Sequence, residues 1–386
     1  MTVVTDAEGS TGTSIQRSAF TVTDVIIATY YYLNCHVSPT SFRCSGMPGP
    51  RPRGDRNVVG GVVDAMNAQG VCAVGFASRD YPGLPKPPPH RAPNLIELLL
   101  ATPAAKAPEG SGPITLCLWW DHSAWTTEEI LQIREAAGMS RNVWHAVYNW
   151  DPTRGRFAVA ADRLPLWDHA FVTDTDEPVY RAPTTCAYPP VDMTVFRPLP
   201  QVPVLWKVSF TCTNFYGGVP HQGVCRKSMC HALAAAYGDK FALFCPSKLV
   251  QGDDLLLKSY RGEVRYSDIP FVCAASEVVL CPCVDITVDK YINERLACAS
   301  ACAANILCDK VKGLVDLFGD TVEYMDPDVN IVTQVEHACG RPNLPEVRER
   351  LLAVARELFE VGRWCRHVCA TISAEASKKW APKSST

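Results

Sequence analysis

The sequence predicts an α/β protein with two domains, each built around a parallel sheet. Three observations lead to this prediction. The chain has 386 residues, which is too long for one ordinary core and fits two domains of roughly 150–200 residues. Short apolar runs alternate with segments of helical period, as in a parallel sheet covered on both faces. The alternation stops at a proline-punctuated join, residues 199–203, and then starts again.

The first half contains five candidate strands, which are short runs of β-branched and aromatic residues. They are 25–33, 71–76, 114–120, 143–150 and 169–173. The candidate helices are 58–69, 94–101 and 127–137. Thr126 followed by Glu128 and Glu129 is the signature of a capped helix start. Segments 39–54 and 80–93 are rich in Pro, Gly and Arg, so we expect long surface loops there.

The second half repeats the pattern. Its candidate strands are 205–212, 241–245, 271–273, 277–281 and 305–308, and its candidate helices are 223–237 and 293–304. Apolar residues then recur every three or four positions over 345–373, which predicts one long amphipathic helix. The predicted division is a flexible N-terminus at 1–18, a first domain at 19–200, a second domain at 201–345, a closing helix at 346–376 and a flexible tail at 377–386.

Composition excludes several classes of protein. Lys plus Arg number 37 against 40 Asp plus Glu, and a net charge of −3 gives no field that would gather nucleic acid or an anionic membrane. No apolar run approaches the ~20 residues of a membrane span, and the start lacks the pattern of a secretory signal. We therefore expect a cytoplasmic protein. Its 18 cysteines are interpreted as buried, reduced thiols in preference to a disulfide framework.

Polar residues that could carry chemistry follow the predicted strands, where ligands bind in open parallel sheets. Asp121, His122 and Asp151 follow strands of the first half. In the second half the corresponding residues are Asn214, Gly217, Gly218, Arg226 and Lys248. A glycine turn leading into a helix suits a phosphate, because the backbone approaches closely and the helix N-terminus is partly positive. A plain turn remains the alternative for the glycine pair.

Several segments together resemble a known family. Residues 187–198, with Pro189, Pro190, Asp192, Phe196 and Pro198, resemble the exit from the first domain of GT-B glycosyltransferases. Tyr260, Gly262 and Val264 resemble the Y-x-G-x-V step of the branch related to the spore-maturation protein CgeB, within glycosyltransferase family 1. Residues 293–296 resemble its N-x-R-x-x-E helix start, and 303–314 match its G-x-x-x-L-x-D-x-x-x-G-L except at the first glycine. Residues 321–326 and the closing helix also resemble this branch.

The resemblance implies two Rossmann-like domains that face each other across a cleft, with the closing helix crossing back to the first domain. It implies transfer of a hexosyl or pentosyl group from a UDP- or GDP-linked sugar to a hydroxyl of a glycan, protein or small molecule, without a metal or further cofactor. Asn293, Glu294 and Arg295 would bind the donor with the glycine turn, Arg226 and Lys248. Asp121, His122 or Asp151 would serve as the base of an inverting transfer. A retaining transfer would not require such a base.

The sequence departs from this family at two positions. The residue three after Arg295, where the family has the glutamate that holds the donor's ribose, is Cys298, and the glycine before the last strand is Ala303. Glu294 is a candidate to replace that glutamate. The departure keeps open a scaffold that only binds a glycan or a partner, and a sugar-nucleotide epimerase is the other alternative. Asp174 and Asp176 resemble a D-x-D metal clamp, but a solvated turn is the preferred interpretation.

Overall fold

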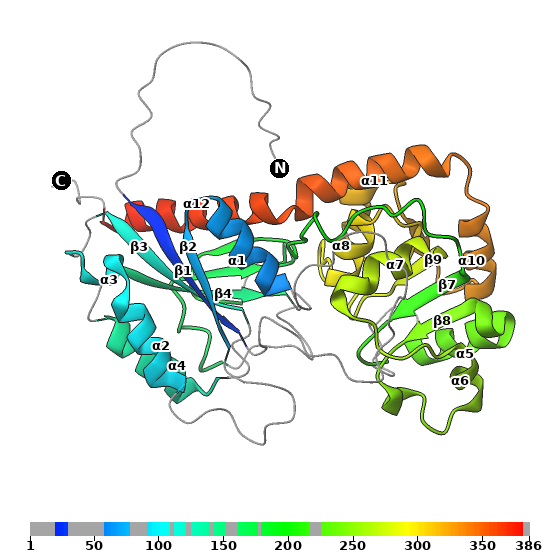
Figure 1. The fold of residues 1–386 in the computed structure, drawn as a ribbon, viewed down its shortest axis with the longest axis horizontal. Coiled ribbons are helices and arrows are strands. Elements are labelled where there is room, and N and C mark those ends of the chain that lie inside the picture. Colours follow the sequence, from blue (N-terminus) through cyan, green and yellow to red (C-terminus); the bar gives the residue numbers. More distant parts are fainter. Residues whose placement is uncertain are drawn as a thin grey trace, which may run out of the picture.

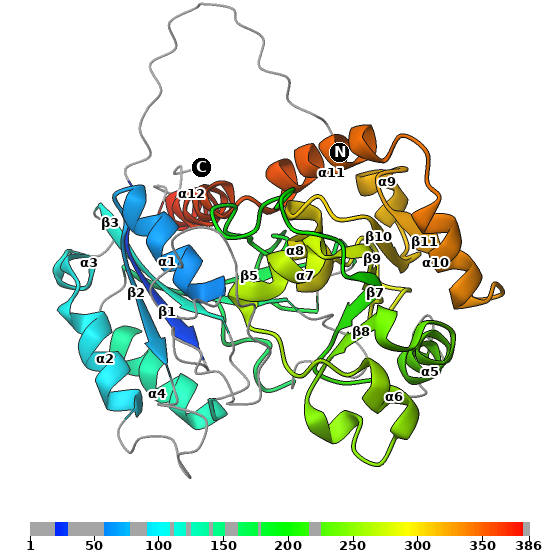
Figure 2. The same cartoon turned by 45° about the vertical axis from the view of Figure 1, so that its right-hand side comes forward.

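The computed structural model of the chain describes residues 20–29, 58–77, 91–108, 112–120, 125–138, 142–150, 161–176, 179–215 and 225–380. These residues form two α/β domains, each with a parallel sheet between layers of helices (Figure 1). The two domains lie side by side, and the last two helices run along one side of the molecule from the second domain to the first (Figures 1 and 2). None of the described helices combines the length and apolar character needed to cross a bilayer.

The first domain has six parallel strands in the order β2-β1-β3-β4-β5-β6. They are β1 (Thr21–Thr29), β2 (Cys72–Ala77), β3 (Pro113–Trp119), β4 (Val143–Asn149), β5 (His169–Val172) and β6 (Thr184–Cys186). The helices are α1 (Val58–Ala68), α2 (Arg91–Ala101), α3 (Pro103–Lys106) and α4 (Thr127–Gly138). Successive residues of β1 point to opposite faces, so Val25 and Ile27 pack with α1 while Ile26 and Ala28 pack with α2 and α4.

The second domain has five parallel strands in the order β11-β10-β9-β7-β8. They are β7 (Trp206–Thr211), β8 (Phe241–Phe244), β9 (Ser276–Cys281), β10 (Ile306–Asp309) and β11 (Glu323–Met325). The helices and turns between them are α5 (Arg226–Tyr237), η3 (Gly238–Lys240), η4 (Ser247–Leu249), α6 (Asp254–Ser259), η5 (Tyr266–Asp268), α7 (Ile269–Ala274), α8 (Glu294–Ala301), α9 (Leu314–Phe318) and α10 (Ile331–Cys339). Helices α5 and α10 cover one face and α8 the other.

The order of this sheet reverses beside β7, because β8 lies on one side of it and β9 on the other. Residues that follow β7 and β9 therefore emerge next to each other at the carboxyl edge, the position where open α/β sheets bind ligands. The predicted strand at 271–273 is wrong, since these residues lie in α7, whose first turn contains Pro270. Strand β9 begins at Ser276, so the apolar run packs as a helix against a face of β7 and β8 instead of joining the sheet.

The predicted closing helix is two helices, α11 (Leu344–Phe359) and α12 (Val361–Trp380). Glu360 between them has an extended backbone, and its carboxylate accepts hydrogen bonds from the amides of Gly362 (2.7 Å) and Arg363 (2.6 Å). It therefore caps α12 in the way that short polar residues cap other helices. The predicted flexible tail also begins too early, because α12 continues to Trp380.

The chain crosses between the two cores twice, at adjacent places. It leaves the first core after Ala187 and enters the second at Val191, which is earlier than the predicted join at 199–203. It returns between Phe359 of the second core and Val361 of the first. The two crossings are hydrogen-bonded: the amide of Val191 donates to the carbonyl of Phe359 (2.7 Å), and that of Val361 donates to the carbonyl of Val191 (3.1 Å).

Candidate functional site

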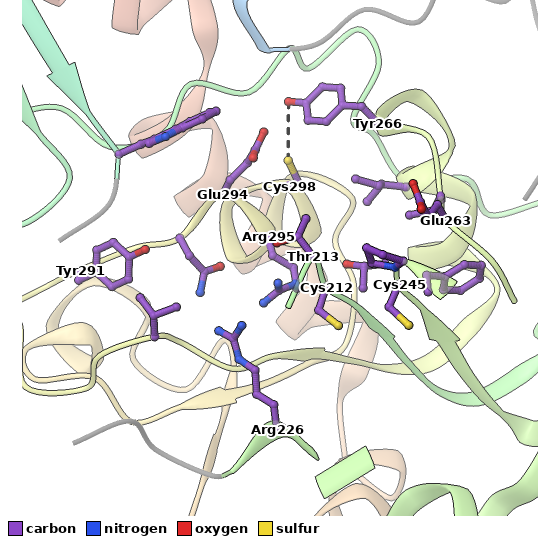
Figure 3. Close-up of a pocket in the computed structure, with 18 residues that line it drawn as sticks. Cys212, Thr213, Arg226, Cys245, Glu263, Tyr266, Tyr291, Glu294, Arg295 and Cys298 are labelled. Carbon is purple, nitrogen blue, oxygen red and sulfur yellow. Dashed lines mark hydrogen bonds between the residues drawn. The ribbon is translucent and has the colours of Figure 1, made fainter. Parts of the chain in front are cut away.

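A pocket of about 420 Å³ opens at the carboxyl edge of the second sheet (Figure 3). Its walls come from residues that follow β7 and β8, from residues 263–269 and from the start of α8. Trp150, which follows β4, contributes from the first domain. The volume is within the range of pockets that bind small molecules or cofactors. Because both domains line it, closure or opening of the domains would change its shape.

Two arginines meet on one backbone carbonyl in this pocket. Arg226 at the start of α5 donates from Nη2 to the carbonyl of Pro282 (3.0 Å), and Arg295 at the start of α8 donates from Nη1 to the same oxygen (3.1 Å). Pro282 directly follows β9. Arg226 also donates to the carbonyl of Asn214 (3.4 Å), and the Arg295 guanidinium lies 5.1 Å from the centroid of the Phe210 ring.

These contacts fix two positive charges close together, and Arg226 is only 5% exposed. Like charges at this distance repel, and burial removes the water that would screen them. An anion with several oxygens relieves both costs, because a guanidinium presents donors in a planar fork that matches phosphate and carboxylate groups. The arrangement therefore favours a multiply charged anion such as a diphosphate.

The start of α8 is held by its own cap. The Asn293 side-chain oxygen accepts from the amide of Leu296 (2.9 Å), while its side-chain nitrogen lies 3.2 Å from Cys283 Sγ and 3.4 Å from the carbonyl of Pro282. Asn293 thus orients the helix toward the carbonyl that both arginines share. The partial positive charge of a helix N-terminus adds to that of the guanidiniums.

A second part of the pocket carries carboxylates and an aromatic hydroxyl: Glu263, Glu294 and Tyr266. Cys298 is 1% exposed, and its thiol contacts the Tyr266 hydroxyl at 3.9 Å (Figure 3). Burial, and then the charge of nearby Glu294, raise the pKa of Cys298. Glu294 therefore lies close to Cys298, the position at which the family that this chain resembles carries a glutamate.

The structure brings together part of the predicted site. The residues that line the pocket are Arg226, Asn293, Glu294 and Arg295. The backbone carbonyl of Asn214 accepts a hydrogen bond from Arg226 and so lies beside them. Lys248 is exposed on η4 and is not among the residues that line the pocket. The remaining predicted residues lie outside the described residues; these are Asp121, His122, Asp151, Gly217 and Gly218.

Sequence reasoning missed several residues of the pocket. Glu263 lies inside the Y-x-G-x-V motif but was not singled out, and Trp150 directly precedes the predicted Asp151. Cys212 and Cys245 are the residues that follow β7 and β8. Their positions directly after predicted strands could have marked them as pocket residues, but cysteine is apolar and was interpreted as part of the core.

The candidate metal clamp at Asp174 and Asp176 has a structural explanation. Asp174 is 4% exposed, which corrects the predicted solvated turn, and its Oδ1 accepts from the amide of Asp176 (3.2 Å). Within the described ranges no group of three or more His, Cys, Asp or Glu side chains is arranged to hold a metal ion. The described cysteines are free thiols, and most are buried.

Comparison with known proteins identifies the fold. The sequence matches no protein-family model, and no curated protein sequence matches it. Among solved structures, Anabaena Alr3699/HepE in complex with UDP is similar with a TM-score of 0.54 and 12% identity, over 91% of this chain and 100% of that chain. Sucrose-phosphate synthase from Thermosynechococcus elongatus is similar with a TM-score of 0.54 and 13% identity, over 91% and 98% of the two chains.

A third similar structure is AviGT4, a glycosyltransferase involved in avilamycin A biosynthesis, with a TM-score of 0.52 and 14% identity over 92% of this chain and 98% of that chain. The chain therefore has the GT-B fold, and the predicted fold class of two Rossmann-like domains is confirmed. The narrower resemblance to the CgeB branch stays a prediction.

Proposed function

We propose that this GT-B chain is a glycosyltransferase that binds a nucleotide-diphosphate sugar in the pocket and transfers the sugar to an acceptor hydroxyl. The observation that carries the proposal is the convergence of Arg226 and Arg295 on the Pro282 carbonyl. This pair lies at the carboxyl edge of the sheet, beside an N-terminally capped helix, which suits a diphosphate. The similar structure of HepE with UDP-glucose supports a uridine nucleotide as the donor.

The two guanidiniums would act on the leaving group. As the bond from the sugar carbon to the diphosphate breaks, negative charge grows on the departing phosphate oxygens. Donors that are already fixed in place stabilise that charge without reorganising at the moment of reaction. Arg226 and Arg295 are fixed in this sense by the backbone carbonyl of Pro282, and we propose that they offset this charge without a metal ion.

The carboxylates would bind hydroxyl groups of the donor. Glu294 lines the pocket beside Cys298, so we propose that it accepts hydrogen bonds from the ribose in place of the glutamate that this chain lacks. Glu263 is available for the nucleoside or the sugar. Carboxylate acceptors form stronger hydrogen bonds with hydroxyls than neutral acceptors do.

The acceptor would enter from the first domain. Trp150 lines the pocket, and its ring lies 5.8 Å from that of Trp120 in an edge-to-face contact. These two residues immediately precede Asp151 and Asp121 in the sequence. Strands β3 and β4 thus lead toward the pocket, which supports keeping Asp121, His122 and Asp151 as the candidate bases of an inverting transfer.

The free thiols support a reducing, cytoplasmic setting.

A panel of nucleotide sugars tests the proposal. Calorimetry with UDP, GDP, UDP-glucose and AMP should show binding of at least one diphosphate and weak or absent binding of AMP. A ligand at about a hundred times its Kd adds ~2.7 kcal/mol to the stability of the folded state, so a thermal-shift measurement gives an independent readout. Failure of every nucleoside diphosphate and sugar-linked diphosphate to bind would contradict the proposal.

A scaffold that only binds a glycan or a partner is the second candidate. Cys298, which stands where the resembled family has its ribose-holding glutamate, is the observation in its favour. The two candidates differ in turnover. A transferase releases nucleoside diphosphate continuously when donor and acceptor are both present, whereas such a scaffold gives no release. Release assays with glycan, protein and small-molecule acceptors separate them.

A further inference from the structure

Two cysteines stand side by side where β7 and β8 end. Thr211 and Phe244 are the last register partners of these parallel strands, so Cys212 and Cys245 form the next pair. The amide of Cys212 still donates to the carbonyl of Phe244 (2.9 Å), which keeps the ladder intact to this point. Neighbouring strands are about 4.8 Å apart. That spacing falls within the Cα separations at which disulfides form, about 4.4–6.8 Å.

Both thiols line the pocket (Figure 3). Cys245 donates a hydrogen bond to the sulfur of Cys212, which lowers the pKa of Cys212 and raises that of Cys245. The positive charges of Arg295 and Arg226 lower the pKa of Cys212 further. Thiolate character and access decide which cysteine attacks a disulfide. Cys212 has the lowered pKa and, at 8% exposed against 1% for Cys245, is the more accessible of the two pocket-lining thiols.

A second thiol pair in the same domain, similarly buried, lies outside the pocket and serves as a comparison. Cys273 and Cys302 also hydrogen-bond through their sulfurs, and both are buried. Neither lines the pocket, and burial raises the pKa of Cys302 well above its usual value. This pair therefore serves as an internal reference for buried thiols that touch but lack the cationic pocket.

We propose that Cys212 and Cys245 form a thiol–disulfide exchange site inside the pocket, open to a small anionic disulfide when the pocket is empty and covered when a nucleotide is bound. Exchange at the two thiols does not depend on the proposed function, whereas their protection by a bound nucleotide rests on it. Oxidised glutathione is the model reagent, because its carboxylates suit Arg226 and Arg295.

The exchange has two steps. The Cys212 thiolate attacks one sulfur of oxidised glutathione, so that a bond forms between Cys212 and glutathione while the glutathione disulfide breaks and one glutathione thiolate leaves. Cys245 then loses its proton and attacks the Cys212 sulfur, which expels the second glutathione as a thiolate. That thiolate takes up the proton. Two protein thiols are oxidised to one disulfide and one glutathione disulfide is reduced to two thiols.

The test uses the full chain with oxidised glutathione, acid quenching, alkylation of the remaining thiols and peptide mass spectrometry. We expect a Cys212–Cys245 cross-linked peptide, reversed by dithiothreitol, with Cys273 and Cys302 still alkylated. Cys245→Ser should accumulate glutathione on Cys212, because the second step is blocked, and Cys212→Ser should leave Cys245 unmodified. Cys302→Ser, the matched control, should form the Cys212–Cys245 disulfide at the wild-type rate.

The exposed Cys225 needs its own control, because hydrogen bonds from Ser228 lower its pKa. Modification confined to Cys225, or equal oxidation of both thiol pairs, would overturn the proposal. UDP at about a hundred times its Kd should slow modification of Cys212 about a hundredfold, because only ~1% of pockets remain empty. If UDP binds by calorimetry and gives no protection, the site is not in the nucleotide pocket. If the disulfide forms and UDP does not bind at all, the exchange site stands and the proposed donor is wrong.

Discussion

Replacing Arg295 by alanine should weaken UDP binding by roughly 10- to 150-fold. The estimate comes from the geometry. Arg295 is held by the Pro282 carbonyl and the Phe210 ring, so little ordering is required when a phosphate arrives. Hydrogen bonds to charged groups contribute about 1.5–3 kcal/mol each. Since about 1.4 kcal/mol corresponds to a tenfold change in Kd, the loss of one such bond gives this range. The Kd of Arg295→Lys for UDP should lie between those of the wild type and Arg295→Ala, because lysine keeps the charge and loses the planar fork.

Isothermal titration calorimetry with UDP measures the change. Arg341→Ala is the matched control: Arg341 also donates to a carbonyl, that of Thr321 (3.3 Å), and it pairs with Glu323 (3.2 Å), but it does not line the pocket. Arg226→Ala and the double variant complete a cycle, and residues that hold one ligand together should be non-additive. Equal weakening of UDP binding by Arg295→Ala and Arg341→Ala would refute the assignment of the phosphate site.

Three further predictions concern the cap, the buried histidines and the acceptor side. Glu360→Ala should lower the free energy of unfolding by about 0.5–2 kcal/mol, because α12 loses its cap. Urea denaturation measures this change, with replacement of the exposed Glu357 by alanine as the control. Equal effects of the two substitutions would contradict the assignment of the cap. Burial lowers the pKa of His145 to about 3 and that of His169 to about 4. Their stabilisation is complete above the unfolded value of 6.5 and is lost as the pH falls toward these folded values, at up to about 1.4 kcal/mol per pH unit for each residue. Urea titrations from pH 7 to 4 should show this slope, and a stably folded His145→Gln variant should show a shallower one; identical slopes would count against it. Trp150→Ala should slow transfer up to about tenfold, the equivalent of a lost aromatic contact, and leave UDP affinity near wild type. A loss of UDP affinity as large as that of Arg295→Ala would place Trp150 on the nucleotide instead.

The central strands of both sheets were predictable because they are buried on both faces and therefore consist of nearly continuous apolar runs, as in β3 and β10. Strands β6 and β11 were not predicted, because each is three residues long, has mostly partly exposed side chains and contains no apolar run. The start of α8 was predictable for a local reason, since Asn293 is a favourable cap for the residues that follow it. Phe271 to Cys273 misled the prediction because a short apolar run has no readable period.

The break at Glu360 had no local signal. Glutamate is a good helix former, and the apolar spacing continues through it without interruption. The break comes from pairing with Val191, which is 169 positions away in the sequence.

The site was predictable in its residue types and not in its geometry. Arg226 was identified from its position near a helix start, and Arg295 from the resemblance of residues 293–296 to a family motif. Their meeting point is a backbone carbonyl, and side-chain identity says nothing about where a carbonyl points. The pairing of Cys212 with Cys245 depends on the order of strands in the sheet, which is a property of the assembled domain.

The hydrogen-bonded crossings at Val191 and Val361 have a consequence for how the domains can move. Because both covalent connections pass through one short bridge, we expect the domains to rotate about it more readily than they slide or separate. The amide of Thr175 in the first domain also donates to the carbonyl of Asp289 in the second (3.0 Å), so such a rotation would have to strain or break this contact. Rotation would also move Trp150 relative to Arg295, because the two residues line the pocket from different domains.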